Sequence, residues 1–434
     1  MRRTVRIAVL GALTALVAGL AVAAPAQAAG SFYDPPADLP GANGALVKTA
    51  PMKLAVQVKT GASTAPLPAT ATQIMYESTD ADGNAVAVTG TYLEPSGSWR
   101  EGGPRPLVSF AAGTQGQGDG CAPSQTLQQG LVFDSESIAI GYEIPQIYAF
   151  LARGIAVVVT DYIGLGMSDR VHSYVVRLDS GHAVLDAARA AKQVPGASVT
   201  DASPIGLYGY SQGGGATASA AELAPTYAPE LSLKAAHAGA PPADLMEVMK
   251  SADGTAIMGV IGFALNGLSQ YEPEMQAALA AEITPQGQAT LASLSTQCIG
   301  DLILRSGTAF TRTSSWTTSG QSLHDLAQRV PAAKAAVDAQ KIGRLTPAIP
   351  VQIVTGTKDD IVAHGQARQL AVDWCRAGVD VDYDPVIQLA SSGGTALNHL
   401  GPAITRGAFS RAWLVDRMLG RPWIDDCALI RLQP

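Results

Sequence analysis

Apolar runs of strand length alternate with helix-forming stretches along most of this chain. Two β-rich runs, residues 72–77 and 84–93, are bounded by polar turn residues, which predicts an antiparallel pair at the start of the fold. Ala-rich stretches at 182–193 and 214–223 predict helices. Six further runs rich in apolar residues predict strands: 106–112, 155–161, 205–210, 233–238, 349–356 and 379–389. Strands joined by helices form crossover connections, so the pattern predicts an α/β fold with a mostly parallel central sheet.

The strand pattern stops between residues 239 and 346, where Ala, Leu, Met and Gln dominate and apolar positions recur three or four apart. We interpret this stretch as a helical cap, or lid, inserted into the core. The expected organisation is a signal peptide at 1–28, a first core part at 29–238, the cap at 239–346 and a second core part at 347–434. Within the cap, residues 255–268 carry no charge and one amide, Asn266. They predict a buried helix or, alternatively, an apolar lid or acyl-chain wall.

The first 28 residues have the order typical of a secretory signal peptide. Three arginines among the first six residues precede an uncharged apolar run, 7–24, which is followed by Pro25 and the small-residue sequence Ala26-Gln27-Ala28. The alternative is a membrane anchor, since the 18 apolar residues approach the length that spans a bilayer. Cleavage after Ala28 is favoured because the proline and small residues follow at once and no basic cluster does. We therefore expect a secreted, extracellular protein without an integral membrane anchor.

Composition and charge narrow the class of protein. With 434 residues, a 47% hydrophobic share and 15% charged residues, the chain can bury at least one large core. Its formal charge is −7, and removal of the three leader arginines makes it −10 (−7 minus 3). Such an acidic protein has no basic face to attract nucleic acid or anionic lipid. We expect no nucleic-acid partner.

Neither a metal ion nor an organic cofactor is indicated by the motifs of the chain. The four cysteines, Cys121, Cys298, Cys375 and Cys427, form no C-x-x-C pair, and no H-E-x-x-H occurs. An even number of cysteines in an exported protein favours disulfides, with three pairings open. The glycine-rich residues 116–120, GQGDG, lack the G-x-G-x-x-G spacing of a dinucleotide-binding loop. We therefore expect any catalysis to use side chains and backbone groups alone.

The most informative motif is G-Y-S-Q-G at residues 209–213, which follows a strand-like run and precedes an Ala-rich helix. A nucleophile elbow needs this setting, because a sharp strand-to-helix turn exposes the serine hydroxyl and flanking glycines leave room for neighbouring backbone. Ser211 is therefore the predicted nucleophile. Since the helix starts at the serine, the backbone N–H of Gln212 is expected to point to where an oxyanion would form.

Serine is a weak nucleophile at neutral pH, so the site also needs a base and an acid, which follow the serine in the order acid, histidine. Four of the six histidines precede the second core part, and His364 comes too soon after the candidate acid, which leaves His399 as the base. Asp359 stands just past the carboxyl end of the run 349–356, where the acid belongs, and Asp360 is the competing acid. In this scheme the acid orients the imidazole, which transfers the serine proton.

The second oxyanion donor is expected in the loop after the run 106–112. Either Thr114 or Gln115 would supply its backbone N–H there, and such a donor contributes on the order of 3 kcal/mol of transition-state stabilisation. The complete predicted site consists of Ser211, Asp359 and His399 with oxyanion donors from Gln212 and from Thr114 or Gln115.

Several motifs together resemble the secretory lipase family of α/β hydrolases, the group similar to fungal lipase A. They are GTQG at 113–116, CAPS at 121–124, DYIGLG at 161–166, GYSQG at 209–213, GTKDDIV at 356–362 and NHL at 398–400. The resemblance implies a secreted bacterial member, a helical cap over an acyl-binding tunnel, and hydrolysis of acylglycerols or other carboxylic esters. It also implies disulfides between Cys121 and Cys298 and between Cys375 and Cys427. Each would restrict the unfolded chain by roughly 4 to 5 kcal/mol in the loop-entropy account.

Three interpretations of the chain remain, and the first is favoured. A secreted serine ester hydrolase, either a lipase working at a lipid–water interface or an esterase, accounts for both the triad and the apolar cap. The same triad in an acyltransferase or a serine peptidase is the nearest alternative, although the cap has no charged cluster for a charged peptide. A non-catalytic binding protein on the same fold is the third, against which the retention of all three triad residue types argues.

Overall fold

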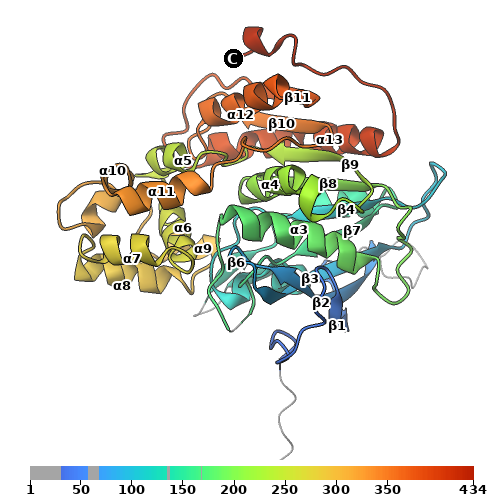
Figure 1. Ribbon diagram of the computed structural model, residues 1–434, viewed down its shortest axis with the longest axis horizontal. Coiled ribbons are helices and arrows are strands. Elements are labelled where there is room, and N and C mark those ends of the chain that lie inside the picture. Colours follow the sequence, from blue (N-terminus) through green and yellow to red (C-terminus); the bar gives the residue numbers. More distant parts are fainter. Residues whose placement is uncertain (1–30, 57–67, 134–136, 168) are drawn as a thin grey trace, which may run out of the picture. The chain divides into compact units, whose positions relative to one another are not determined.

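A nine-stranded sheet runs through the centre of the described part of the chain (Figure 1). The computed structural model describes residues 31–56, 68–133, 137–167 and 169–434, so the predicted signal peptide lies outside the described residues. The strands of the sheet are β1 (Leu46–Met52), β2 (Ala69–Thr79), β3 (Ala85–Pro95), β4 (Leu107–Ala111), β7 (Ala156–Thr160), β8 (Ile205–Tyr210), β9 (Leu233–Gly239), β10 (Val351–Gly356) and β11 (Val381–Val386). Their spatial order is β1-β2-β3-β7-β4-β8-β9-β10-β11.

The strands from β7 to β11 in this order pair in parallel, whereas β1, β2 and β3 form an antiparallel edge. The predicted α/β class with a mostly parallel sheet is therefore confirmed. Successive side chains of a strand point to opposite faces, and in β4 both faces are covered. Leu107 and Ala111 join the core on one side of the sheet, and Val108 and Phe110 join the core on the other.

Helices supply both of these covering layers. On one face lie α3 (Arg177–Ala191), α4 (Gln212–Tyr227) and α12 (His364–Arg376), whose buried side chains belong to the larger core. The other face is covered by α2 (Ile144–Leu151) and α13 (Leu397–Met418). The many alanines of α3 and α4 allow these helices to approach the sheet closely, and β8 is buried along its length except at its last residue, Tyr210.

Seven helices of the described chain follow β9 and precede β10 in the sequence, in the stretch for which we predict a cap (Figure 1). They are α5 (Leu245–Ala252), α6 (Val260–Leu268), α7 (Pro273–Ala280), α8 (Pro285–Leu294), α9 (Ile299–Leu304), α10 (Leu323–Arg329) and α11 (Pro331–Ala339). Their apolar side chains form a separate core around Phe263, Leu302 and Leu326. The helical content matches the expectation, while the boundaries of the cap as a domain stay a prediction.

The helix expected at 255–268 begins later, at Val260. The backbone groups before it are used by distant loops: the carbonyl oxygen of Thr255 accepts from the N–H of Phe310, and the N–H of Ala256 donates to the carbonyl oxygen of Gly394, both at 2.8 Å. These long-range hydrogen bonds compete with helix formation, so the composition alone placed the helix start too early.

Several short elements have no counterpart in the predicted pattern. β1 is a half-exposed edge strand in which Lys48, Thr49 and Pro51 interrupt the apolar residues, so its sequence signal is weak. The others are α1 (Pro123–Gln129), β5 (Leu131–Phe133), β6 (Ile138–Ile140), α2 and the 3₁₀ turns η1 (Asp119–Cys121), η2 (Thr313–Trp316) and η3 (Ile430–Leu432), and the longer helix α13 was not predicted either. Among the helices described, none combines the length and the apolar character needed to cross a bilayer.

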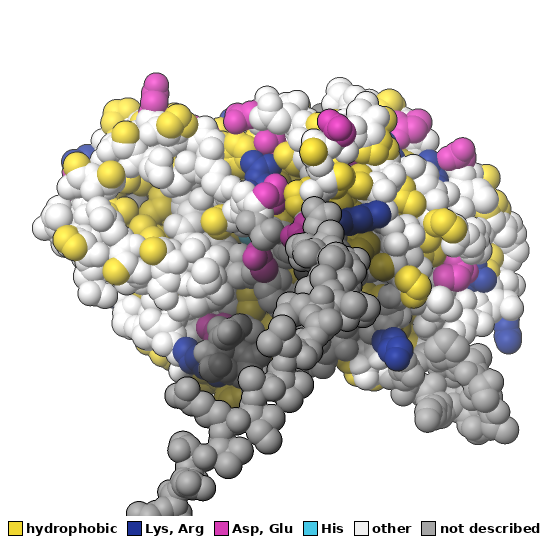
Figure 2. All heavy atoms as spheres, turned by 90° about the horizontal axis from the view of Figure 1, so that it is seen from below, with side chains coloured by type: hydrophobic (Ala, Val, Ile, Leu, Met, Phe, Trp, Pro, Cys, Tyr) yellow, Lys and Arg dark blue, Asp and Glu magenta, His cyan; other side chains and the backbone are white. Residues whose placement is uncertain are grey.

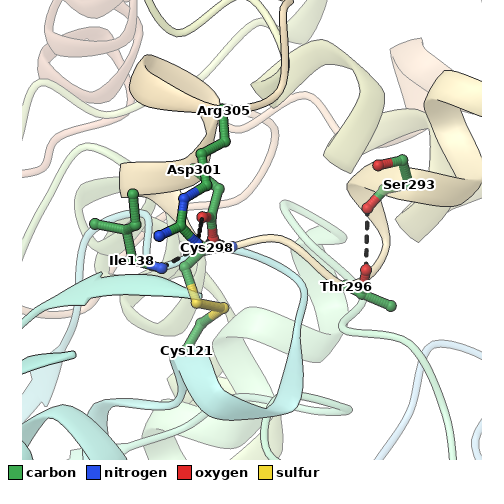
Figure 3. Close-up of a disulfide and its surroundings, with 7 residues drawn as sticks. All are labelled: Cys121, Ile138, Ser293, Thr296, Cys298, Asp301 and Arg305. Carbon is green, nitrogen blue, oxygen red and sulfur yellow. Dashed lines mark hydrogen bonds and ion pairs between the residues drawn. A yellow bond between two sulfur atoms is a disulfide. The ribbon is translucent and has the colours of Figure 1, made fainter. Parts of the chain in front are cut away.

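Two disulfides, Cys121–Cys298 and Cys375–Cys427, join distant parts of the chain, which confirms the pairing implied by the family resemblance. Figure 3 shows the first of them, which ties the loop after β4 to the start of α9. Asp301 lies beside it and accepts a hydrogen bond from the backbone N–H of Cys298 at 2.9 Å. The loop after β4 is therefore anchored to the helical stretch between β9 and β10 of the chain.

The face of the molecule in Figure 2 carries charges of both signs. Lys and Arg side chains are interspersed there with Asp and Glu, and hydrophobic side chains lie between them. Mixed charges of this kind create no extended field of one sign. The described residues on this face therefore offer a polyanion no continuous basic stripe.

Candidate active site

Ser211 occupies the sharp turn between β8 and α4. Its backbone has φ 58° and ψ −122°, a conformation that residues other than glycine rarely adopt. Glycines make room for the turn, because a Cβ on Gly209 would lie 2.2 Å from the carbonyl oxygen of Gly213. A Cβ on Gly213 would lie 2.0 Å from the carbonyl oxygen of Ala111. The N–H of Ser211 donates to the carbonyl oxygen of Gly239 on β9 (2.9 Å), which ties the turn to the sheet.

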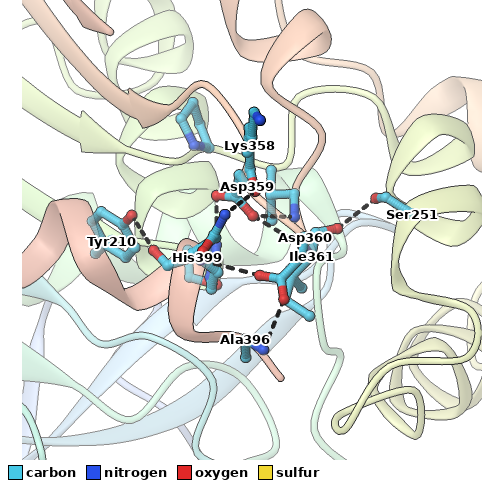
Figure 4. A network of polar contacts seen from close by, with 12 residues as sticks. Tyr210, Ser251, Lys358, Asp359, Asp360, Ile361, Ala396 and His399 are labelled. Atoms are coloured by element: carbon cyan, nitrogen blue, oxygen red, sulfur yellow. Dashed lines mark hydrogen bonds and ion pairs between the residues drawn. The ribbon is translucent and has the colours of Figure 1, made fainter. Parts of the chain in front are cut away.

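The structure brings Ser211, His399 and Asp359 into hydrogen-bond contact, although 188 and 40 residues separate the bonded pairs. The Oγ of Ser211 lies 2.8 Å from Nε2 of His399. Nδ1 of the same ring lies 2.8 Å from Oδ2 of Asp359 (Figure 4), and both side chains are buried. A carboxylate can only accept, so Nδ1 carries the ring proton and Nε2 is left to accept the proton of the serine hydroxyl. The arrangement can therefore generate a serine nucleophile.

The two adjacent acids have different partners, as Figure 4 shows. Oδ1 of Asp359 accepts from the backbone N–H groups of Ile361 (3.0 Å) and Val362 (2.9 Å), which turns Oδ2 toward the imidazole. Asp360 instead accepts from the backbone N–H groups of Ala396 (3.0 Å) and His399 (3.2 Å). Asp359 thus contacts the imidazole ring of His399. Asp360 instead forms hydrogen bonds with the backbone at the first turn of α13, the helix that contains His399.

Two residues outside the predicted set also hold the histidine in place. The hydroxyl of Tyr210 donates to the carbonyl oxygen of His399 (2.6 Å), and the two ring centroids are 5.4 Å apart. Nδ2 of Asn398 donates to the carbonyl oxygens of Lys358 and Ala390, both at 2.8 Å, and so joins the acid loop to the histidine loop. The only local signal for these roles is that Tyr210 lies in the elbow motif and Asn398 precedes the histidine.

Of the two residues proposed for the second oxyanion donor, Thr114 lines the cavity beside Ser211 and Gln212. The backbone of Gln115 is bonded to the cap, since its carbonyl oxygen accepts from the N–H of Ile299 (2.7 Å). Its side chain folds back, with Nε2 donating to the carbonyl oxygen of Gly113 (3.2 Å). The position of Thr114 therefore favours its N–H as the donor.

Two polar side chains form hydrogen bonds with the backbone of this loop. The N–H of Gly113 donates to Oε1 of Glu143 (2.7 Å), and the hydroxyl of Tyr142 donates to the carbonyl oxygen of Thr114 (2.7 Å). Burial raises the pKa of the Glu143 carboxyl to about 7, although the hydrogen bond from Gly113 opposes that shift. The backbone of the loop beside the serine is thus held by side-chain hydrogen bonds as well.

An apolar cavity opens beside Ser211 and holds about 840 Å³ including its mouth. Its wall comes mainly from α5, α6, α7, α10 and α11, and no lining residue among those described is charged. Representative wall residues are Val248, Ile261, Leu265, Met275, Leu323 and Val337. Cavities lined by aliphatic side chains with a few polar groups at one end bind apolar small molecules. Within the described residues, no group of three or more His, Cys, Asp or Glu side chains is placed to hold a metal ion.

The sheet order, the helical layers and the serine turn between β8 and α4 define an α/β hydrolase. The fold is similar to that of Candida antarctica lipase A, with a TM-score of 0.71 and 23% sequence identity over 89% of this chain and 84% of that chain. Residues 128–426 match the secretory lipase family, and the chain belongs to this family.

Two relatives illustrate the range of proteins to which the chain is similar. A probable inactive lipase of Mycobacterium tuberculosis (strain CDC 1551 / Oshkosh) is 28% identical over 407 residues, which cover 91% of this chain and 83% of the relative. Lipase 2 of Candida albicans (strain SC5314 / ATCC MYA-2876) is 27% identical over 440 residues, covering 96% of this chain and 86% of the relative. The chain is thus similar both to a protein named as a lipase and to one named as inactive.

Proposed function

We propose that this protein is a secreted serine carboxylic-ester hydrolase, a lipase or esterase that acts through an acyl-enzyme. One observation carries the proposal: two contacts of 2.8 Å connect the Ser211 hydroxyl through His399 to Asp359, and Ser211 also lines an apolar cavity. Membership of the secretory lipase family and the two disulfides support both the reaction type and an extracellular location.

The proposed reaction proceeds in two halves. Oγ of Ser211 attacks the ester carbonyl carbon while Nε2 of His399 takes its proton, and the carbonyl oxygen becomes an oxyanion between the N–H groups of Gln212 and Thr114. The ester C–O bond then breaks, and the imidazolium returns the proton to the leaving alcohol. Water attacks the acyl-enzyme in the same way and releases the acid. Asp359 stabilises the imidazolium in both halves.

The cavity favours substrates with an apolar acyl chain. Its wall bears aliphatic side chains without charge, so a bound chain would be removed from water along its length. Each buried CH₂ group contributes about 0.8 kcal/mol, which is about a fourfold gain in binding per methylene. The same wall offers no ionic partner for a charged peptide, which argues against the serine peptidase alternative. An acyltransferase would use the same site with an alcohol in place of water.

A non-catalytic role is the second candidate, favoured by the similarity to the probable inactive lipase. Against it stands the hydrogen-bonded arrangement of Ser211, His399 and Asp359, since a binding protein needs neither the strained serine turn nor a buried carboxylate behind the imidazole. Replacement of the serine distinguishes the two candidates.

The test is hydrolysis of p-nitrophenyl esters from acetyl to stearoyl by the wild type and by Ser211→Ala. Ser219→Ala is the matched control, because this serine lies two turns further along α4 and its hydroxyl donates to the carbonyl oxygen of Arg177 (2.7 Å). We expect hydrolysis by the wild type and the control, none by Ser211→Ala, and labelling of Ser211 alone by an alkyl phosphonate. A wild type inactive on every ester would support the binding role instead.

A further inference from the structure

We propose that residues 172–174, named here the 172–174 clamp, position both oxyanion donors by holding the side chains of Gln212 and Thr114. The proposal rests on the proposed function, because it concerns how that site is kept in shape. The clamp precedes α3 and lies outside the predicted site. Its two rings, those of His172 and Tyr174, are buried and face different halves of the oxyanion hole.

His172 holds the donor that follows the nucleophile. Nδ1 of His172 lies 2.9 Å from the carbonyl oxygen of Ile163, which can only accept, so this nitrogen carries the ring proton. Nε2 is therefore an acceptor, and it lies 2.8 Å from the side-chain Nε2 of Gln212, which donates to it. Burial lowers the pKa of His172 to about 4, so the ring stays neutral and remains an acceptor at neutral pH.

Tyr174 holds the other donor. Its hydroxyl lies 2.7 Å from Oγ1 of Thr114, and the two hydroxyls share a buried hydrogen bond. The carbonyl oxygen of Thr114 meanwhile accepts a hydrogen bond from the hydroxyl of Tyr142 (2.7 Å). Thr114 is thus bonded through its side chain and its backbone, which leaves its N–H little freedom to turn away from the cavity.

The clamp is itself bonded to the core loop and to the cap. Nε2 of Gln117 donates to the carbonyl oxygens of His172 (3.0 Å) and Phe263 (2.9 Å), so one side chain joins the clamp to α6. A Cβ on Gly267 would lie 2.8 Å from the backbone nitrogen of Tyr174, so α6 packs directly on the clamp backbone. The same helix forms part of the cavity wall. The clamp therefore fixes the positions of the oxyanion donors relative to the wall that would hold the substrate.

The physical benefit is preorganisation. An oxyanion hole is effective only when its donors already point to the position of the developing charge. A Gln212 side chain without a partner could rotate, and the backbone N–H of the same residue would then be held less firmly. The contact with His172 fixes this side chain and so restricts the movement of the N–H. The clamp residues act through Gln212 and Thr114, so they are positioning residues.

The central experiment compares His172→Phe with the matched control His182→Phe. His182 is also a buried histidine whose Nδ1 contacts a carbonyl oxygen, that of Thr79 at 2.8 Å, but it stacks on Tyr227 away from the serine. With p-nitrophenyl butyrate we expect kcat of His172→Phe to fall roughly 10- to 100-fold, because a small misplacement of a donor is costly. KM should stay within about twofold, since ground-state binding uses the apolar wall. The control should keep its kcat.

Three further readouts separate positioning from folding. The affinity for a trifluoromethyl ketone, which forms an oxyanion on the serine, should fall by the same factor as kcat. His172→Gln, which restores an acceptor oxygen, should recover part of the loss. Gln212→Met should reproduce the loss, and combining it with His172→Phe should add little. If His172→Phe does not fold, Gln212→Met and Tyr174→Phe carry the same test.

The outcomes are distinct. Wild-type kcat in a folded His172→Phe variant, an equal loss in His182→Phe, or additive losses in the double variant would overturn the clamp and leave the proposed function intact. A wild type without ester hydrolysis would overturn the proposed function, and the clamp with it.

Discussion

Replacing Asp359 by asparagine should lower kcat far more than replacing Asp360 by asparagine. Oδ1 of Asp359 accepts from two backbone N–H groups, those of Ile361 and Val362, so the amide oxygen of an asparagine must stay there. The NH₂ group then faces Nδ1 of His399, which can no longer carry the proton. The proton moves to Nε2, which cannot accept from Ser211. We expect kcat to fall about 10⁴-fold, which corresponds to about 5.5 kcal/mol.

Asp360→Asn leaves the ring of His399 and its proton unchanged. It weakens the hydrogen bonds to the N–H groups of Ala396 and His399, because one of the two oxygens is replaced by a donor. A buried N–H without a partner costs about 1 to 3 kcal/mol of stability. We therefore expect a lower free energy of unfolding and a loss in kcat below about tenfold.

The assay is the hydrolysis of p-nitrophenyl butyrate at saturating substrate, with denaturant unfolding of both variants as the measure of stability. A folded Asp359→Asn variant within about tenfold of the wild type would refute the reasoning about the ring proton. A greater loss in Asp360→Asn than in Asp359→Asn would reverse the assignment of the acid.

Two further predictions concern stability. Replacing Cys121 and Cys298 by serine removes a cross-link between residues 177 positions apart and should lower the free energy of unfolding by about 5 kcal/mol in denaturant titrations. Replacing Cys375 and Cys427, which are 52 positions apart, should lower it by about 4 kcal/mol. The first change alone should also lower kcat, because it frees the loop that bears Thr114; equal kcat in both variants would contradict this. Burial lowers the pKa of His237 to about 4, so between about pH 6.5 and 4 the unfolded chain binds a proton that the folded chain does not. The stability of the wild type relative to His237→Asn should therefore fall toward acid by up to about 1.4 kcal/mol per pH unit, and parallel curves from pH 7 to 5 would contradict the shift.

The strands of the sheet's centre could be predicted because each is a local apolar run that must be covered on both faces. β8 begins and ends where the pattern places it, and β10 differs at one end only. β1 was missed because an edge strand needs few apolar residues. The start of α6 was misplaced because hydrogen bonds to Phe310 and Gly394 use the backbone before it, and no local pattern reports these partners.

The candidate active site, like the fold, has residues that could be predicted from local sequence and residues that could not. The elbow around Ser211 is visible in five consecutive residues, since a tight turn imposes glycine where backbone approaches backbone. His399 and Asp359 follow from their order along the chain. The parts played by Asp360, Tyr210 and His172 could not be predicted, because each depends on a partner that is distant in sequence.

By itself the sequence determined the α/β class, the serine turn and the helical content of residues 239–346, because these depend on periodicity, glycine placement and composition within short windows. The tertiary structure alone decided which backbone groups Asp360 holds, which loop residue lines the cavity, and which buried histidine contacts the side chain of Gln212. The physical reason is that hydrogen bonds act over about 3 Å, and only the packing of the whole chain brings residues 40 to 188 positions apart within that reach.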